Sequence, residues 1–151
     1  MTLGETILAE AARQLDKGTK AVSDGSWFDS LMTTLTSKAS TLPATDNTTL
    51  ATQAAIAAVA QQREKIIGLG SSTFALFLDK LSSGKEEEAA SIYLRATGSA
   101  DAIIEAMEQG TLGVLDAKRK LDKIWADAWN IVKSVAITGA KILLPLVLAA
   151  L

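Results

Sequence analysis

The most regular hydrophobic pattern lies in the last third of the chain, from residue 114 to residue 151. Apolar or small side chains recur there at alternating spacings of four and three residues, the heptad pattern of a helix that turns one stripe toward a partner helix. Charged and polar side chains fill the positions between them as far as Lys141. The pattern predicts an amphipathic helix with an interface stripe. This stripe comprises Leu121, Trp125, Ala128, Val132, Val135, Gly139, Ile142 and Leu146, and all of these except Gly139 are candidate interface residues.

The chain ends in an apolar tail, because residues 142–151 carry no polar side chain. A helix that is apolar on all sides must be surrounded by protein or lipid. We expect Pro145 to kink or end the helix near Leu144, since proline lacks an amide N–H and clashes with the preceding turn. Membrane-spanning helices need about 18 apolar residues, whereas runs of about 10–14 are more often buried core helices. The tail therefore favours burial in a protein core or subunit interface, with membrane insertion as the alternative.

Residues 1–113 carry apolar side chains at helical spacing in several shorter segments. The clearest interruption is the loop at residues 40–47, where Pro43 disfavours helical geometry in the residue before it. Asp46 or Thr45 can cap the helix that follows, which we expect over residues 48–67. The expected helices begin near Thr2, Ser26, Thr48, Ser71, Ser83 and Ser99.

These segments predict an all-α fold without strands or repeats. We expect a multi-helix bundle of about six helices, with a long amphipathic C-terminal helix that ends in an apolar tail. Residues 1–113 would form the helical bundle and residues 114–151 the C-terminal helix and tail, together as one domain.

Composition narrows the possible functions. The chain has 151 residues, 48% of them hydrophobic, which is enough for one domain with a proper core. Its formal charge of −2 does not suit a general nucleic-acid-binding protein, so we expect no nucleic-acid partner. It has no cysteine and no histidine, which removes thiolate chemistry and the commonest general base. The N-terminal residues lack the pattern of a signal peptide, so we expect synthesis in the cytoplasm, with a virion or membrane-associated destination left open.

Motifs that carry chemistry are weak. Gly68 and Gly70 precede Ser71, but their spacing matches neither a Walker loop nor a dinucleotide-binding loop, and it indicates a joint between two helices. Glu105 and Glu108 lie three residues apart on one helix face, yet helical carboxylate metal sites are completed by histidine. We therefore expect no catalytic residue, no metal ligand, no cofactor and no small-molecule substrate.

A small basic cluster lies on the last helix ahead of the apolar tail. Because acidic residues are interleaved with it, we interpret it as a solvated, salt-bridged helix face. Contact with anionic lipid headgroups is the alternative. The cluster consists of Lys118, Arg119, Lys120 and Lys123.

The stripe, the tail and the lack of a catalytic motif favour a non-enzymatic structural subunit. Such a subunit would pack through its C-terminal helix against copies of itself or other subunits of a larger assembly, of the kind found in virions or secretion machines. The alternative function is a membrane-active protein that inserts residues 132–151 into a bilayer, as a pore, lesion or ejection protein would. An enzyme or ligand carrier would require an internal cavity with converging polar groups.

Overall fold

The computed structural model describes residues 3–16, 25–43, 46–98 and 100–150. The expected helix starts at Thr2 and Ser99, and the alternative cap Thr45, therefore lie outside the described residues. Within these ranges the chain forms helices and no strand. The elements are α1 (Leu3–Asp16), α2 (Ser26–Ser40), α3 (Asn47–Gln61), α4 (Arg63–Ile66), the 3₁₀ turn η1 (Ile67–Leu69), α5 (Ser71–Ser82), α6 (Glu86–Thr97), α7 (Asp101–Glu108) and α8 (Val114–Ala150).

The predicted all-α fold with a long C-terminal helix is confirmed, but the described residues form eight α-helices rather than about six. One reason is the segment predicted as a single helix over residues 48–67. The backbone leaves helical geometry at Gln62 (φ −100°, ψ 17°), so α3 ends there and the single turn α4 follows. The predicted cap at Asp46 is present, because its Oδ1 accepts a hydrogen bond of 2.8 Å from the Thr48 amide.

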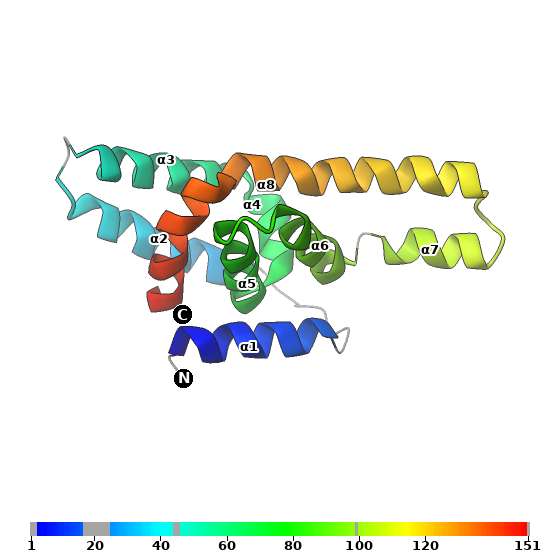
Figure 1. Cartoon of the computed structure of the whole chain (residues 1–151), viewed down its shortest axis with the longest axis horizontal. Coiled ribbons are helices and arrows are strands. Elements are labelled where there is room, and N and C mark those ends of the chain that lie inside the picture. Colours follow the sequence, from blue (N-terminus) through cyan, green and yellow to red (C-terminus); the bar gives the residue numbers. More distant parts are fainter. Residues whose placement is uncertain (1–2, 17–24, 44–45, 99, 151) are drawn as a thin grey trace.

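Helix α5 lies at the centre of the bundle because it is apolar on nearly every side. All residues from Thr73 to Leu78 are buried. Helix α8 crosses α5 and also packs against α3 and α6, while α1 covers another side of α5 (Figure 1). Trp27 of α2 extends this core, with its ring centroid 6.1 Å from that of Phe74.

Helix α8 is bent, because its backbone leaves helical geometry at Ala136 (φ 62°, ψ 163°). In Figure 1 the last segment of α8 points in a different direction from the first and runs toward the N-terminal end of α1. The helix does not end near Leu144, because Pro145 lies inside the helix that follows the bend. Proline fits a helical φ and removes a single hydrogen bond. The carbonyl that loses its donor belongs to the exposed Lys141, where water can satisfy it.

The apolar tail packs into the core of its own chain. Ala140, Leu143 and Val147 are all fully buried, and their spacing places them on one face of the helix. The tail also touches α1, since a methyl group added at Gly4 would lie only 3.0 Å from Cδ1 of Leu148. In this conformation the tail is a core element of the monomer.

One ion pair ties the first turn of α2 to α4. The Nε atom of Arg63 donates to Oδ1 of Asp29 at 3.0 Å, and its Nη2 donates to Oδ2 at 3.1 Å. These two hydrogen bonds hold the pKa of Asp29 below its usual value. Gly25 caps α2 at a φ of 86°, and a Cβ atom there would lie 2.9 Å from Nη2 of Arg63. A larger residue at position 25 would strain the backbone and disturb the ion pair.

Candidate functional site

Helix α7 and the beginning of α8 form a two-helix arm that projects beyond the rest of the bundle (Figure 1). We define the arm as residues 101–125, which include α7, the turn after it and the first three turns of α8. Ala117 is the single buried residue of the arm. No residue of the arm belongs to the hydrophobic core cluster or is packed against it. The arm therefore contributes little to the core of the monomer.

Large apolar side chains on the arm are exposed to solvent. The exposed fractions are 41% for Ile104, 75% for Val114, 63% for Leu115 and 39% for Trp125. Scattered exposed hydrophobic residues are normal, but a cluster of them marks an interaction site. The described chain has seven exposed large hydrophobic residues, and four of the seven lie on the arm, while three lie elsewhere. Those three are Leu3, Leu42 and Leu50.

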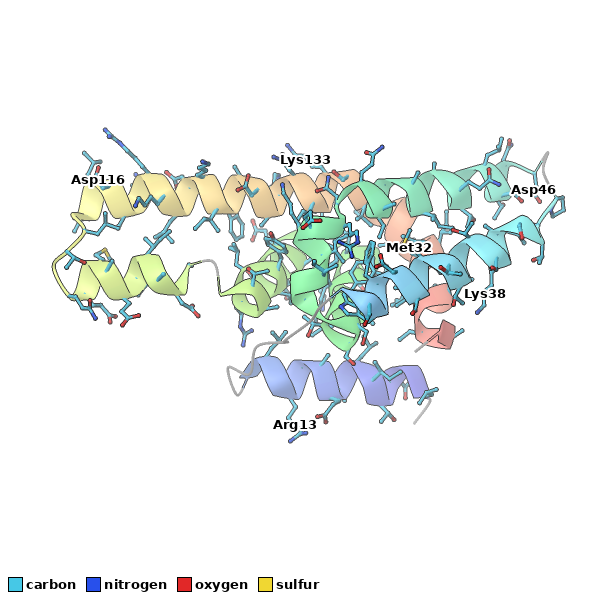
Figure 2. All side chains as sticks on the ribbon, turned by 180° about the vertical axis from the view of Figure 1, so that it is seen from behind. Arg13, Met32, Lys38, Asp46, Asp116 and Lys133 are labelled. Carbon is cyan, nitrogen blue, oxygen red and sulfur yellow. The ribbon has the colours of Figure 1, made fainter. Side chains whose placement is uncertain are left out.

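The two helices of the arm differ in charge. Helix α7 has three acidic residues, Asp101, Glu105 and Glu108, and no basic residue. Residues 114–125 have four basic residues, Lys118, Arg119, Lys120 and Lys123, against Asp116 and Asp122. Nη1 of Arg119 lies 4.0 Å from Oδ1 of Asp116. Among the described residues, none forms an ion pair with Lys118, Lys120 or Lys123. The arm thus presents an acidic helix beside a helix with excess positive charge; Figure 2 shows its side chains, with Asp116 labelled near the tip.

The two tryptophans of α8 stack at the base of the arm. Their ring centroids are 6.2 Å apart and the ring planes differ by 16°. Trp129 is packed against the core, whereas Trp125 is exposed. Because Trp129 is packed against the core, the stack favours one position of the exposed Trp125 ring. Tryptophan is among the residue types that are enriched at the energetic centres of protein interfaces.

The structure divides the predicted interface residues between the core and the surface. Ala128, Val132 and Val135 are buried by helices of the same chain, while Leu121, Ile142 and Leu146 are partly exposed and Trp125 is exposed. Leu121 and Trp125 lie on the arm. A contact between these side chains and another subunit remains a prediction.

The buried stripe of α8 shifts by one position after the bend. The heptad pattern places Ile142 and Leu146 on the stripe, but the buried residues are Leu143 and Val147. Because Ala136 is not helical, the spacing that is counted from the first half of α8 does not continue through it.

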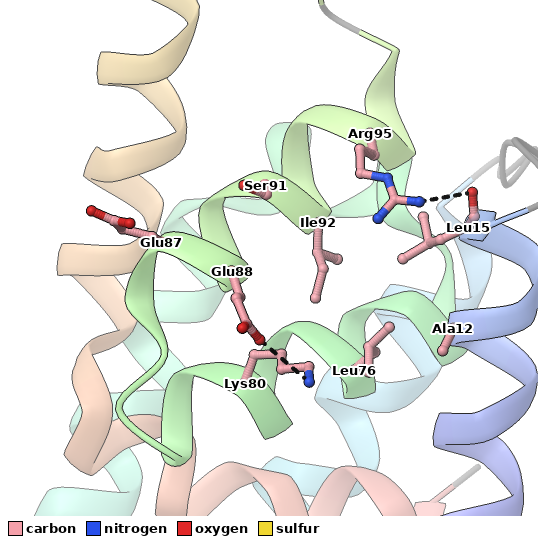
Figure 3. Close-up of a pocket in the computed structure, with 9 residues that line it drawn as sticks. All are labelled: Ala12, Leu15, Leu76, Lys80, Glu87, Glu88, Ser91, Ile92 and Arg95. Atoms are coloured by element: carbon pink, nitrogen blue, oxygen red, sulfur yellow. Dashed lines mark hydrogen bonds and ion pairs between the residues drawn. The ribbon is translucent and has the colours of Figure 1, made fainter.

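A second candidate site is a pocket of about 390 Å³ between α1, α5 and α6. Leu15, Leu76 and Ile92 form its apolar floor, and charged groups lie around its rim (Figure 3). The Nζ atom of Lys80 lies 3.4 Å from Oε2 of Glu88. Nη2 of Arg95 donates a hydrogen bond of 3.2 Å to the carbonyl oxygen of Leu15, which ties α6 to the end of α1.

The groups around this pocket are engaged in holding the helices together. Ser91 is the hydroxyl on its lining, and it lies in the regular helix α6. A serine nucleophile needs an adjacent base, but no hydrogen bond joins Ser91 to another described side chain. The ammonium of Lys80 is already paired with a carboxylate. Among the described residues, the lining of the pocket therefore offers no activated nucleophile, and we place the candidate functional site on the arm.

Two further features bear on function, namely groups that could bind a metal ion and helices that could cross a membrane. Across the described residues there is no group of three or more carboxylates that could hold a metal ion. One helix among these residues, Val114–Ala149, is long and apolar enough to cross a bilayer. This criterion uses only length and composition, and core helices of soluble proteins also meet it.

The sequence matches no protein-family model, and neither a curated protein nor a solved structure is significantly similar to it. The arguments about function therefore rest on the arm, the bend and the core.

Sequence reasoning missed the exposed residues Ile104, Val114 and Leu115. Ile104 shares helical spacing with Ile103 and Met107, and this spacing alone gives no reason to expect Ile104 to be exposed. A periodic pattern indicates which side chains share a face but not whether that face is covered. The feature that could have indicated this exposure is the shortness of α7, because a helix of eight residues offers too small a surface to cover the neighbouring turns of α8.

Proposed function

We propose that this chain is a non-enzymatic structural subunit that assembles with further copies of itself through the arm of its C-terminal region. The observation that carries the proposal is the concentration of exposed apolar side chains on an arm where Ala117 alone is buried. Leu121 and Trp125, two of the interface residues predicted from the heptad pattern, lie within the same surface.

Covering the arm with protein would be favourable. Full burial of an isoleucine, valine or leucine side chain contributes about 1.5–3 kcal/mol. Ile104, Val114 and Leu115 expose between 41% and 75% of their surface, so covering each would contribute about 1 kcal/mol on that scale. Association itself costs at least about 4 kcal/mol in lost translational and rotational freedom. A stable contact therefore needs apolar side chains from both partners.

The position of the tail supports a contact at the arm rather than at the C-terminus. Leu143 and Val147 are fully buried within the chain. A partner could reach them only if the segment after Ala136 left the core, which would expose these side chains to water. The arm needs no such rearrangement.

The test is the mass of the full chain in solution, measured by light scattering over a range of concentrations. The double variant Ile104→Asp with Leu115→Asp places charges in the exposed cluster. Both positions are already exposed, so the helicity and the melting temperature should stay close to those of the unsubstituted chain. The matched control is Leu50→Asp, since Leu50 is 53% exposed and lies on α3, outside the arm.

We expect the unsubstituted chain and the Leu50→Asp control to form a defined oligomer, and we expect the arm variant to be monomeric. A chain that is monomeric at every concentration would contradict the proposal. An oligomer that survives in the arm variant would contradict the location of the contact.

A second candidate function is membrane insertion of residues 132–151. It is supported by the length and composition of Val114–Ala149 and by the bend at Ala136, where straightening would carry the tail away from the bundle. Release of dye from vesicles that contain anionic lipids tests it, with protein added at neutral and at acidic pH. Insertion predicts dye release that is lost when residues 142–151 are deleted. Intact vesicles under both conditions would argue against this function.

A further inference from the structure

We infer that the partner of the arm is the arm of a second copy, arranged so that α7 of one chain lies beside the first turns of α8 of the other. The two hairpins would then form a four-helix bundle around a two-fold axis. This inference rests on the proposed function and adds the surface of the second copy that the arm meets and the pairing of the helices. The exposed residues Ile104 and Leu115 would lie in the interior of that bundle.

Charge selects this pairing of helices. Placing α7 against α7 of a second chain would bring the acidic residues of two copies together, because α7 has no basic residue. Placing the first turns of α8 against each other would bring Lys118 and Lys120 near their own copies. Pairing α7 with α8 instead sets Glu105 and Glu108 against lysines that form no ion pair among the described residues of their own chain. Such complementarity contributes little affinity at a surface, but it fixes orientation and partner choice.

A two-fold arrangement satisfies both helices of both copies at once. In an isologous contact the same surface serves on each chain, so that α7 meets α8 twice. Helix pairs with apolar faces commonly associate in this way, as four-helix bundles with the helices nearly antiparallel. The contact is closed, so it makes a dimer that can act as the unit of a larger assembly.

The opposite end of the molecule does not offer the arm a matching surface. Leu42 and Leu50 are exposed there, near the loop between α2 and α3. The charged residues close to them are Lys38 and Asp46, one of each sign. Among its described residues, that end presents neither an acidic surface for the basic turns of α8 nor a basic surface for α7.

The experiment is a charge-reversal exchange between two variants of the full chain. One variant carries Glu105→Lys and Glu108→Lys on α7. The second carries Lys118→Glu and Lys120→Glu on α8, two positions that point to opposite flanks of the helix by its spacing of 3.6 residues per turn. Glutamate and lysine are both good helix formers, so the helices should persist. The control carries Lys133→Glu and Lys141→Glu, which are exposed on α8 outside the arm.

Each arm variant alone should dimerise about tenfold or more weakly than the unsubstituted chain, because like charges then face each other at both contacts. In an equimolar mixture, native mass spectrometry should find the heterodimer restored, since both contacts again pair opposite charges. High salt should reduce the preference for the heterodimer. The control should dimerise like the unsubstituted chain.

Three results would overturn the inference, and they bear differently on the proposed function. If the unsubstituted chain is monomeric, the inference and the proposed function both fail. If charge reversal weakens association but the mixture gives no preference for the heterodimer, the arm remains the assembly surface and the pairing of α7 with α8 is wrong. If neither charge reversal nor Ile104→Asp with Leu115→Asp affects the dimer, the contact lies elsewhere on the molecule and both fail.

Discussion

Replacing Ala136 with glycine should stabilise the protein, although alanine is the better helix former. Ala136 has a φ of 62° and a ψ of 163°, a conformation that is open to glycine but strained for other residues. Such strain costs about 1–3 kcal/mol. Glycine also gives the unfolded chain more freedom, which opposes folding by about 0.4–1 kcal/mol. The net gain should be about 1 kcal/mol, or about 2–4 °C in melting temperature for a chain of this size.

The sign of the effect distinguishes a bent helix from a continuous one. In a continuous α8, Ala136→Gly would cost about 1 kcal/mol, as it does in any helix interior. Ala126→Gly is the matched control, because Ala126 is exposed in the regular part of the same helix and its replacement should show that cost. Gly70→Ala is the reciprocal variant, since Gly70 has nearly the same backbone (φ 79°, ψ 160°) and should lose about 1–3 kcal/mol.

Free energies of unfolding from urea titrations, followed by circular dichroism, would measure all three variants. We expect Ala136→Gly to unfold at a higher urea concentration than the parent chain, and the other two at lower concentrations. If Ala136→Gly is destabilised to the same extent as Ala126→Gly, then α8 is straight. In that case the burial of the tail in the core would also be wrong.

Further predictions concern the core and the titratable groups. Leu143→Ala should cost about 2–5 kcal/mol in unfolding free energy, because Leu143 is fully buried and its removal leaves a cavity; a loss near zero would place the tail outside the core. The ion pair with Arg63 lowers the pKa of Asp29 in the folded chain. The pair therefore contributes to the free energy of unfolding above the ordinary carboxyl pKa, and this contribution is lost as the pH falls through the pKa of the folded state. Asp29→Asn should therefore flatten the fall in urea midpoint below about pH 4, where the unfolded carboxyl titrates, and an unchanged slope would show that the pair does not form. Burial of Tyr93 and the nearby charge of Asp127 raise the pKa of the Tyr93 hydroxyl. The stability that the neutral side chain contributes is therefore lost as the pH rises above the ordinary tyrosine pKa. Tyr93→Phe should keep more of its stability than the parent chain at about pH 11, above the usual tyrosine pKa, and equal alkaline losses would contradict this reading.

The fold class was predictable because most helices follow local rules. Phe74, Phe77 and Leu81 lie at helical spacing between turn signals, and this pattern was sufficient to place α5. Asp46 caps α3 as its residue type suggests. Boundaries such as the interruption at Gln62 have no comparable signal, because glutamine is an ordinary helix former.

The bend at Ala136 could not be predicted from local sequence. Alanine has the highest helix propensity, and the heptad spacing runs through position 136 without interruption. Pro145 carries the stronger local signal for a break, yet the helix continues through it. The bend arises from tertiary structure, because folding back buries Leu143 and Val147 against the bundle and thereby offsets the strain. The helical periodicity of the sequence does not indicate how much stability this burial contributes.

The candidate site could be predicted only in part. Leu121 and Trp125 were recognised from the heptad spacing, but Ile104 and Leu115 were not, since exposure depends on which helices are near enough to cover a face. The same limit applies to Val132 and Val135, which fit an intermolecular stripe equally well but are covered by the chain's own helices.

The most direct test of this account is hydrogen–deuterium exchange of the full chain at low and at high protein concentration. The account predicts that amides of residues 137–148 exchange slowly at both concentrations, because the tail belongs to the core of the monomer. Amides of residues 101–125 should exchange quickly in dilute solution and become protected only as the chain associates. Protection that appears in residues 137–148 on association, while residues 101–125 stay unchanged, would show that the tail is the assembly surface and would contradict the account.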